Sequence, residues 1–329
     1  MELCGKKILV TGATGFIGSH LVEELVNKGA QVRILVRYRS DGKIGNLEKM
    51  PKEILGKLEI YRGDLKNFDA VKKAAKDVDI IFHLGAIISI PFSYADPREI
   101  VDVNVIGTLN ILRAGQEHNS KKIVITSTSE VYGTAIYTPI DEKHPLQAQS
   151  PYSASKISAD KLAESFFRTY NLPITIVRPF NTYGPRQSMR AVIPTIIYQA
   201  LTKEKIDIGS LDPKRDFTFV KDIVKGFIKS AESEDNIGEV INIGSGKAIS
   251  VKELVEKIGK ILGKNLITET NEKKVRPENS EVGLLLCNNL KAKRLINWEP
   301  ETSFEKGLFE IIKYIKENLR EYELERGNI

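Results

Sequence analysis

The sequence predicts an α/β protein built on a doubly wound parallel sheet, with a smaller α/β lobe towards the C-terminus. Two observations predict this fold class. Short apolar runs alternate with amphipathic segments along the first half of the chain, which is typical of βαβ units with helices on both faces of one sheet. From about Gly184 the pattern loosens into shorter elements interrupted by prolines, which indicates the second lobe.

Each element of the first half follows from its own pattern. The predicted strands are short apolar runs bounded by turn residues, at Lys7–Thr11, Gln31–Val36, Leu58–Tyr61, Val78–Leu84, Lys122–Ser127 and Ile174–Pro179. The predicted helices carry apolar residues at intervals of three or four, at Phe16–Asn27, Pro97–Glu117 and Ser153–Tyr170. One later apolar run, Val240–Ile243, is predicted to be a strand that returns to the first sheet.

Composition excludes several classes of protein. With 329 residues, 41% of them hydrophobic and 28% charged, the chain can bury a sizeable core. Two cysteines and four scattered histidines offer no metal-ligand spacing, so we expect no metal site and a reducing compartment. The net charge of +6 is spread out, which argues against nucleic-acid binding. No apolar run of about 18 residues and no signal-peptide core occur, so we expect a cytoplasmic protein that does not enter membranes.

A glycine-rich turn follows the first predicted strand. The residues after Thr11 read Gly-Ala-Thr-Gly-Phe-Ile-Gly and lead directly into an amphipathic helix. Glycine is needed where the backbone turns tightly and approaches a pyrophosphate, and the free N–H groups of the helix start face its charge. This strand–turn–helix context predicts a Rossmann-type dinucleotide site formed by Gly12, Thr14, Gly15, Phe16, Ile17 and Gly18.

The end of the second predicted strand bears on the choice of dinucleotide. An acidic residue at this point binds the ribose hydroxyls of NAD, but the chain reads Arg37-Tyr38-Arg39-Ser40 and offers no carboxylate. Two arginines and a serine suit the 2′-phosphate of NADP, which the sequence therefore favours over NAD, although arginines at a strand end are also common without a ligand. Asp64, after the third strand, is expected to reach the adenine edge.

These features divide the chain into two predicted parts. Residues 1–183 form the dinucleotide-binding domain, together with a return segment at about 215–248. Residues 184–214 and 249–329 form the lobe that binds the second substrate.

A tyrosine and a lysine four residues apart form a candidate general base. Tyr152 and Lys156 lie on one face of a predicted helix. The pKa of a free phenol is near 10, and lowering it by ~3 units takes ~4 kcal/mol, which a close ammonium and a positively charged nicotinamide can supply. The turn Thr128-Ser129-Glu130 follows the fifth strand and so faces the same crevice as the glycine turn.

Together these motifs resemble one known family. TGATGFIG (11–18), GDL (63–65), FHLGA (82–86), NVIGTLN (104–110), STSEVYG (127–133), YSASK (152–156), RPFNTYGPR (178–186) and RDFTFVKD (215–222) are similar to the extended short-chain dehydrogenase/reductases that act on nucleotide sugars. The chain looks most like the 4,6-dehydratases of that family. The run PFNTYGPRQSMRAVIPTII (179–197) is similar to GlcNAc-type dehydratases of the bacterial legionaminic acid pathway.

The resemblance implies a function and a role for each catalytic residue. It implies an NDP-GlcNAc or NDP-hexose 4,6-dehydratase, which forms a 4-keto-6-deoxy sugar by moving a hydride from C4 to C6 on tightly bound NADP or NAD. Tyr152 is then the base on the C4 hydroxyl, Lys156 tunes it and Thr128 orients the sugar. Glu130 is base at C5 and acid at the C6 oxygen, a residue that 4-epimerases of the family usually lack.

Ser129 departs from the dehydratase pattern. Many 4,6-dehydratases have an aspartic acid at this position, so the acid that protonates the C6 oxygen besides Glu130 is missing here. GDP-mannose dehydratases and UDP-glucuronate decarboxylases share the serine. Decarboxylation therefore stays open as an alternative reaction, and 4-epimerisation stays open beside it. A regulator that binds the cofactor but catalyses no reaction is a third alternative. The intact catalytic residues argue against the regulator: Tyr152, Lys156, Thr128 and Glu130.

The resemblance also implies further contacts and an assembly. For the cofactor it implies Leu65, Leu84, Gly85, Ala86, Asn104, Ser127 and Pro179, besides Tyr152 and Lys156. For the nucleotide sugar it implies Ser89, Ser93, Asn181, Arg186, Val192, Arg215 and Arg276. His83 is expected to be a satisfied core histidine. The family commonly dimerises through a four-helix bundle, to which this chain would contribute 97–117 and 153–170.

Overall fold

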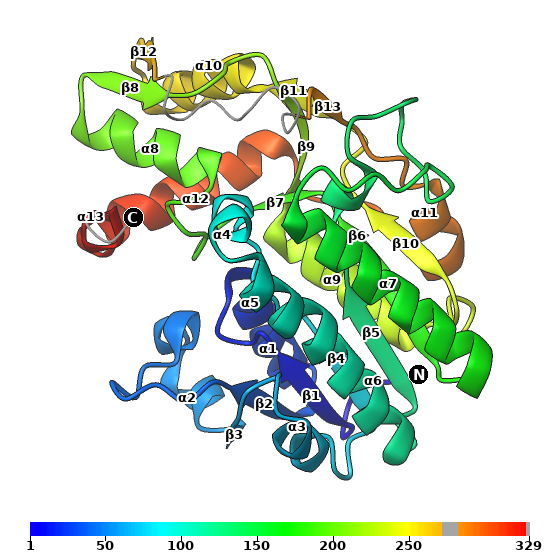
Figure 1. Ribbon diagram of the computed structural model, residues 1–329. Coiled ribbons are helices and arrows are strands. Elements are labelled where there is room, and N and C mark those ends of the chain that lie inside the picture. Colours follow the sequence, from blue (N-terminus) through cyan, green and yellow to red (C-terminus); the bar gives the residue numbers. More distant parts are fainter. Residues whose placement is uncertain (272–281, 327–329) are drawn as a thin grey trace.

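A seven-stranded parallel sheet forms the centre of the protein (Figure 1). The computed structural model describes residues 1–271 and 282–326. The strands follow the order β10-β6-β5-β4-β1-β2-β3. Their bounds are β1 (Lys7–Thr11), β2 (Gln31–Val36), β3 (Glu59–Arg62), β4 (Ile80–His83), β5 (Lys122–Thr126), β6 (Ile174–Pro179) and β10 (Val240–Ile243). This is the doubly wound Rossmann arrangement that the sequence predicts, with the return strand β10 at the edge.

Helices cover both faces of this sheet because its strands are apolar on both sides. Along β1, Ile8 and Val10 belong to one hydrophobic cluster and Leu9 to another, as alternation along a strand requires. The first cluster is covered by α1 (Phe16–Asn27) and α9 (Val220–Glu232), and the second by α3 (Phe68–Ala74), α6 (Gly107–Glu117) and α7 (Pro151–Tyr170). Helices thus cover both faces of the central strands, and the turns that follow these strands lie at the edge where open α/β sheets bind ligands.

The helix predicted over Pro97–Glu117 is interrupted. It consists of α5 (Pro97–Val101), a π-helical turn over Asp102–Ile106, and α6. The wider turn carries the fully buried Asn104, whose amide bonds the backbone of Ile87 and the hydroxyl of Ser155. Apolar periodicity alone gives no sign of this break, since it is set by a tertiary polar contact.

The remaining elements before the second lobe are short. They are a 3-10 turn over Gly45–Lys49, α2 (Lys52–Leu55), α4 (Ile90–Ala95) and a 3-10 turn over Ser129–Tyr132. The strands β3 and β4 begin one and two residues later than the sequence predicts, within ordinary variation of element ends.

The second lobe lies beyond the carboxyl ends of the central strands (Figure 1). Its larger sheet contains β7 (Asn181–Tyr183), β9 (Lys214–Phe219), β11 (Ala248–Ser250) and β13 (Leu284–Leu285), and its smaller sheet pairs β8 (Lys205–Ile208) with β12 (Ile267–Thr270). The later helices are α8 (Val192–Thr202), α10 (Val251–Leu262), α11 (Leu290–Ile296), α12 (Phe304–Glu317) and α13 (Leu319–Arg326). Because β9 pairs within this lobe, the chain returns to the central sheet with α9 rather than at about residue 215. The lobe boundaries otherwise stay a prediction.

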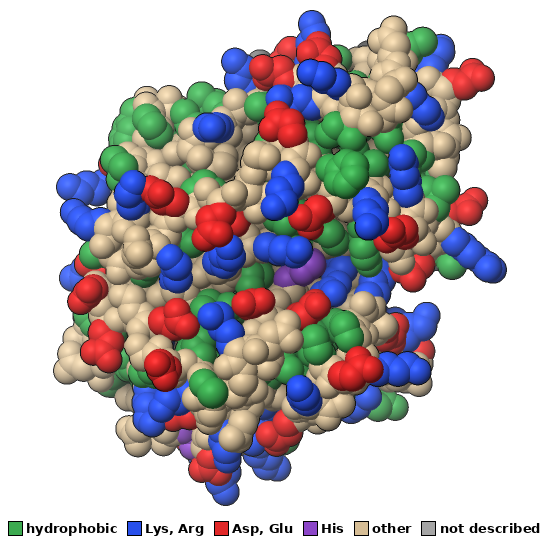
Figure 2. All heavy atoms as spheres, turned by 180° about the vertical axis from the view of Figure 1, so that it is seen from behind, with side chains coloured by type: hydrophobic (Ala, Val, Ile, Leu, Met, Phe, Trp, Pro, Cys, Tyr) green, Lys and Arg blue, Asp and Glu red, His purple; other side chains and the backbone are tan. Residues whose placement is uncertain are grey.

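Charges of both signs are interspersed over the surface. Figure 2 shows lysines and arginines next to acidic side chains over the whole of one face. Among residues 1–271 and 282–326, no helix is both long and apolar enough to cross a membrane.

Candidate active site

The candidate site lies where four parallel strands end side by side. The strands β1, β4, β5 and β6 are neighbours in the sheet, so the turns that follow them gather at one edge. The strand order reverses between β1 and β4, and ligands of open α/β sheets bind at such a switch point. The structure therefore brings the glycine turn, the segment after His83 and the turn after Thr126 to one crevice.

The glycine turn is shaped for a close-lying ligand. Gly12 has a φ of +68°, and a Cβ there would lie 2.6 Å from the carbonyl carbon of Leu84. A Cβ on Gly18 would lie 2.1 Å from the Gly12 oxygen. Helix α1 starts after Gly15 with no side-chain cap, so its first N–H groups remain available to an anion. The residues present thus fit a dinucleotide pyrophosphate.

A series of buried hydrogen bonds through His83 holds the segment after β4 against this turn. Thr108 gives its one hydroxyl proton to the carbonyl of Asn104, so its oxygen accepts from Nε2 of His83 at 3.1 Å. Nδ1 of His83 then accepts from Oγ1 of Thr11 at 2.7 Å, and that oxygen accepts from the N–H of Gly85 at 3.1 Å. Burial lowers the pKa of His83 to about 3, so its ring is neutral. His83 is a satisfied core histidine, as the sequence indicates.

Other residues expected at the cofactor have structural partners. Asn110 donates from its amide to the carbonyl of Leu65 at 2.8 Å, and Leu65 packs where a Cβ on Gly85 would stand. The Asn104 side chain accepts from the N–H of Ile87 and donates to the Ile87 carbonyl and the Ser155 hydroxyl. Asp64 accepts from the backbone N–H of Lys66 at 2.9 Å. Contacts of these residues with the cofactor stay predictions.

The arginines expected to bind a 2′-phosphate are exposed, and one is engaged. Arg39 donates from Nε and Nη2 to the two oxygens of Asp41, at 3.0 and 2.7 Å. Arg37 and Ser40 are exposed on the same segment. The negative charge of the Asp41 carboxylate would repel the 2′-phosphate of NADP next to Arg39. The structure therefore weakens the preference for NADP that the sequence predicts.

Tyr152 and Lys156 lie together on the buried face of α7. The Lys156 ammonium donates to the carbonyl of Thr126 at 2.6 Å, and burial lowers its pKa to about 8 against the opposing charge of Asp160. Burial raises the pKa of the Tyr152 phenol above its ordinary value, and a hydrogen bond with Thr128 lowers it by less. The sequence predicts a lowered phenol pKa, but in the protein by itself burial and the negative charges of Glu130 and Asp160 raise it, and the hydrogen bond with Thr128 does not offset them.

The turn after β5 presents a carboxylate to the same crevice. The N–H of Glu130 donates to the Thr128 hydroxyl at 3.2 Å, which closes the turn. The Glu130 carboxylate is half-buried, and its negative charge contributes to the raised pKa of Tyr152. Ser129 is buried in the turn. A phenol, an ammonium, a hydroxyl and a carboxylate thus meet from α7 and this turn.

The residues expected to bind the nucleotide sugar lie in different parts of the structure. Asn181 has a buried side-chain oxygen with no hydrogen-bond partner, and Arg215 lies on the neighbouring strand β9 with its Nη1 donating to the Lys214 carbonyl. Ser93 is fully buried and donates to the Ile90 carbonyl, so it is not at the crevice surface. Ser89 caps α4 and Val192 begins α8. Pro179, expected at the cofactor, ends β6. Arg276 lies outside the described residues.

Arg186, expected to clamp the pyrophosphate, pairs with α1. Its Nη2 contacts the Glu23 carboxylate at 2.6 Å, while its Nη1 is buried without a partner. Asn46 donates from its amide to the Arg186 carbonyl and from its N–H to the Thr14 carbonyl, at 3.2 and 3.0 Å. Sequence reasoning misses Glu23 and Asn46, because no motif marks either and only the fold brings them to this loop.

One cavity lies away from this crevice. It has a volume of about 640 Å³ and lies between α7, β6 and β10, lined among others by Asp160, Arg178 and Lys291. None of the residues expected to be catalytic lines it. We place the site at the strand ends, because the chemically reactive groups converge there.

Comparison with known proteins shows the family. A family profile described as GDP-mannose 4,6 dehydratase matches residues 9–311. The chain belongs to this family of extended short-chain dehydrogenase/reductases. The dehydrogenase/reductase is 32% identical to a putative UDP-glucose 4-epimerase of Methanocaldococcus jannaschii, over 95% of this chain and 99% of that protein.

Two solved structures show the same architecture as this dehydrogenase/reductase. UDP-glucuronic acid 4-epimerase from Bacillus cereus, in complex with UDP-glucuronic acid and NAD, is 31% identical with a TM-score of 0.86, covering 95% of this chain and 99% of that one. dTDP-glucose 4,6-dehydratase from Bacillus anthracis, in complex with NAD, is 30% identical with a TM-score of 0.86, covering 98% and 100%. The family thus includes epimerases and dehydratases of one fold, and the site residues must distinguish them.

Proposed function

We propose that this protein is an NDP-sugar 4,6-dehydratase, acting on an NDP-GlcNAc or NDP-hexose. The observation that carries the proposal is the Glu130 carboxylate, which faces the crevice next to Tyr152 and Thr128. A 4-epimerase has to oxidise C4 and re-reduce it, for which the phenol suffices. A dehydratase has also to remove the C5 proton and protonate the leaving C6 oxygen, for which a carboxylate in this place is suited.

The residues of this chain divide the reaction between them. The bound dinucleotide supplies the hydride acceptor for C4, the later hydride donor for C6, and a positive charge close to the phenol. Tyr152 removes the proton of the C4 hydroxyl, which Thr128 orients, and Lys156 stabilises the phenolate. Glu130 then removes the C5 proton, made acidic by the C4 ketone, and transfers a proton to the C6 oxygen, which leaves as water.

We propose NAD as the dinucleotide. The pairing of Arg39 with Asp41 supports this choice over NADP, since the carboxylate repels a 2′-phosphate and engages one of the two arginines that the sequence offers for it. The NAD in the two solved relatives supports it as well.

The first test combines a substrate panel with one substitution. The purified protein is incubated with UDP-, GDP-, CDP- and dTDP-sugars, and the products are analysed for loss of water by mass spectrometry. In Glu130→Gln, the rate of water loss is expected to fall about 10²-fold or more. Absorbance should still show reduction of the nicotinamide, because C4 oxidation depends on Tyr152. Water loss at the wild-type rate in Glu130→Gln contradicts the proposed role.

A 4-epimerase is the second candidate, favoured by the names of two relatives. Under this alternative the product has the mass of the substrate and an inverted C4. Carbon dioxide released from UDP-glucuronate would instead indicate a decarboxylase. Mass analysis of the same panel distinguishes loss of water from loss of carbon dioxide, and NMR spectroscopy of the products detects an inverted C4.

A further inference from the structure

The turn that carries Glu130 is held at both ends by buried side chains. At its start, Oγ of Ser127 donates to Oδ2 of Asp160 at 2.8 Å. At its end, the hydroxyl of Tyr132 accepts from Nη1 of Arg178 at 2.9 Å. The three residues expected to be catalytic in this turn lie between these two anchors.

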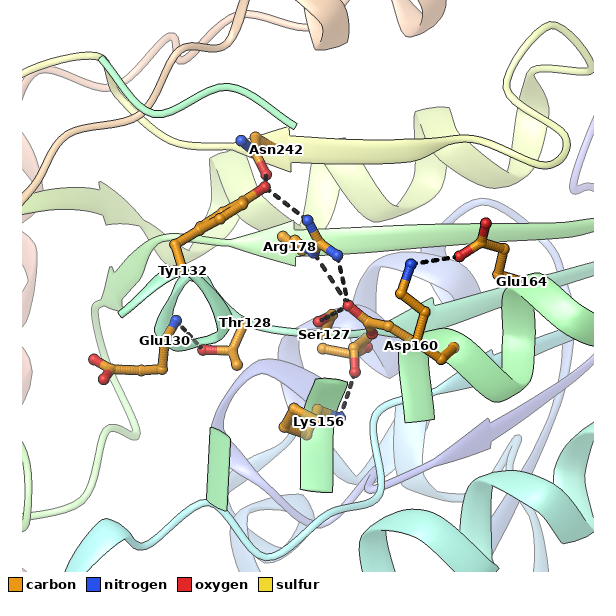
Figure 3. Close-up of polar contacts among 11 residues, drawn as sticks. Ser127, Thr128, Glu130, Tyr132, Lys156, Asp160, Glu164, Arg178 and Asn242 are labelled. Atoms are coloured by element: carbon orange, nitrogen blue, oxygen red, sulfur yellow. Dashed lines mark hydrogen bonds and ion pairs between the residues drawn. The ribbon is translucent and has the colours of Figure 1, made fainter. Parts of the chain in front are cut away.

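One ion pair links the two anchors. Arg178 donates from Nε and Nη2 to the same Oδ2 of Asp160, at 3.1 and 2.9 Å, and the Tyr132 hydroxyl donates to Oδ1 of Asn242 at 2.7 Å. Figure 3 shows the resulting continuous series of contacts behind the Thr128–Glu130 turn. We call these five residues the buried polar chain: Ser127, Asp160, Arg178, Tyr132 and Asn242. None is more than 3% exposed.

Stability alone does not account for such an arrangement. Removing two charges from water is costly, and apolar residues of similar volume often serve a folded core as well as a buried ion pair does. Apolar contacts, however, have no preferred direction, whereas Arg178 makes three hydrogen bonds in the plane of its guanidinium. The distinctive effect of the buried polar chain is therefore geometric.

The buried polar chain is tied to the helix face that carries the base. Tyr152, Lys156 and Asp160 are spaced four residues apart along α7, so they lie on one side of the helix. Asp160 thus fixes the turn after β5 against the same face that presents the phenol. The position of the Glu130 carboxylate relative to Tyr152 depends on this connection.

We propose that the buried polar chain positions the Glu130 carboxylate for the proton transfers at C5 and C6. The proposal rests on the proposed function, which assigns those transfers to Glu130. Its members are positioning residues, since Ser127 and Tyr132 direct their hydroxyls to the ion pair and not to the crevice. Loosening the turn should impair the transfers made by Glu130 more than the C4 oxidation made by Tyr152.

The experiment uses Tyr132→Phe, which removes one hydroxyl of the buried polar chain. Tyr183→Phe is the matched control, because it removes another buried hydroxyl, which donates to the Phe304 carbonyl at 3.1 Å in the second lobe. In Tyr132→Phe, water loss is expected to fall about 10- to 100-fold, while nicotinamide reduction changes less than about twofold. An equal fall of both rates, or no fall in the folded variant, overturns the proposal.

A second readout does not depend on the reaction. Amide hydrogen exchange of peptides covering 127–132 is expected to be about tenfold faster in Tyr132→Phe than in Tyr183→Phe, with the two variants compared at the same temperature interval below their melting temperatures. Unchanged exchange in this turn overturns the proposal. If the wild-type protein releases no water, the proposed function fails, and the exchange comparison still decides whether the buried polar chain holds the turn.

Discussion

At the scale of single residues, burial controls the protonation of the site more than neighbouring charges do. It lowers the pKa of Lys156 to about 8 and raises that of Tyr152, so the ammonium and the phenol are each shifted towards their neutral forms. In the protein without a bound dinucleotide, the Tyr152 phenol therefore keeps its proton near pH 7. The four-residue spacing of Tyr152 and Lys156 in the sequence does not reveal these pKa shifts, because burial depends on the whole fold.

Tyr152→Phe is expected to abolish C4 oxidation, with a fall in nicotinamide reduction of about 10²- to 10⁴-fold. Affinity for the nucleotide sugar should change little, since the phenol acts mainly in the transition state. Stopped-flow absorbance measures the first quantity and titration calorimetry the second. Tyr170→Phe, at the exposed end of the same helix, is the control. Near-normal reduction in Tyr152→Phe would show that another group is the base.

Asp41 is expected to influence the choice of cofactor. Wild-type protein denatured after purification should release NAD. Asp41→Ala frees the Arg39 guanidinium and removes a negative charge, so NADP should bind about tenfold more tightly than to the wild type. Chromatography of the released dinucleotide and fluorescence titration test the two statements. Recovery of NADP alone from the wild type would restore the preference that the sequence favours.

At the scale of elements, exposed apolar side chains lie on α5 and on the π-helical turn before α6. Val101 on α5 is 43% exposed and Ile106 in the turn is 39% exposed. On the neighbouring α7, Leu162 and Phe166 are half-buried and pack partly against the core. We propose that the exposed apolar residues lie in the four-helix bundle of a homodimer, as the family resemblance implies.

Light scattering is therefore expected to give twice the chain mass of 36.8 kDa at micromolar concentration. Val101→Glu should shift the protein towards the monomer by placing a charge in the apolar contact, with no change in the circular dichroism spectrum. Leu290→Glu, which alters a 68% exposed leucine on α11, should leave the dimer intact. A wild-type monomer under these conditions contradicts the proposed assembly.

At the scale of the whole molecule, α1 of the central domain contacts the loop after β7. Nε2 of His20 donates to the Pro185 carbonyl at 2.9 Å, and Glu23 pairs with Arg186. Burial, aided by the charge of Arg186, lowers the pKa of His20 to about 4. The imidazole in this contact is therefore neutral near pH 7, because burial and the Arg186 charge disfavour its protonated form.

This contact predicts loss of stability in mild acid. Between pH 6.5 and about 4 the unfolded chain binds a proton at His20 that the folded chain does not, so stability is complete above this window and falls as pH decreases through it. At pH 5 the loss due to His20 is about 2 kcal/mol, and His83 adds a loss of the same sign. Urea unfolding at pH 7 and pH 5 should show a smaller difference for His20→Gln than for the wild type. An equal difference would exclude His20 as a cause.

The sequence by itself determines the central sheet, the glycine turn and the identity of the reactive groups. Apolar periodicity is a local property, and it places β1, β2, β6, β10 and α1 at their observed bounds. The parallel order of the strands then places their carboxyl ends at one edge, which is why Thr128, Tyr152 and the glycine turn are predictable as neighbours.

The tertiary structure alone decides how these groups are held and charged. Asp160 pairs with Arg178, which lies 18 positions away, and Glu23 pairs with Arg186, 163 positions away. Asn104, in the π-helical turn, bonds Ile87, 17 positions away. Partners at such separations leave no periodic pattern in a chain, because their proximity results from the packing of separate elements. Burial has the same origin, so the pKa values of Tyr152, Lys156 and His20 are properties of the folded molecule.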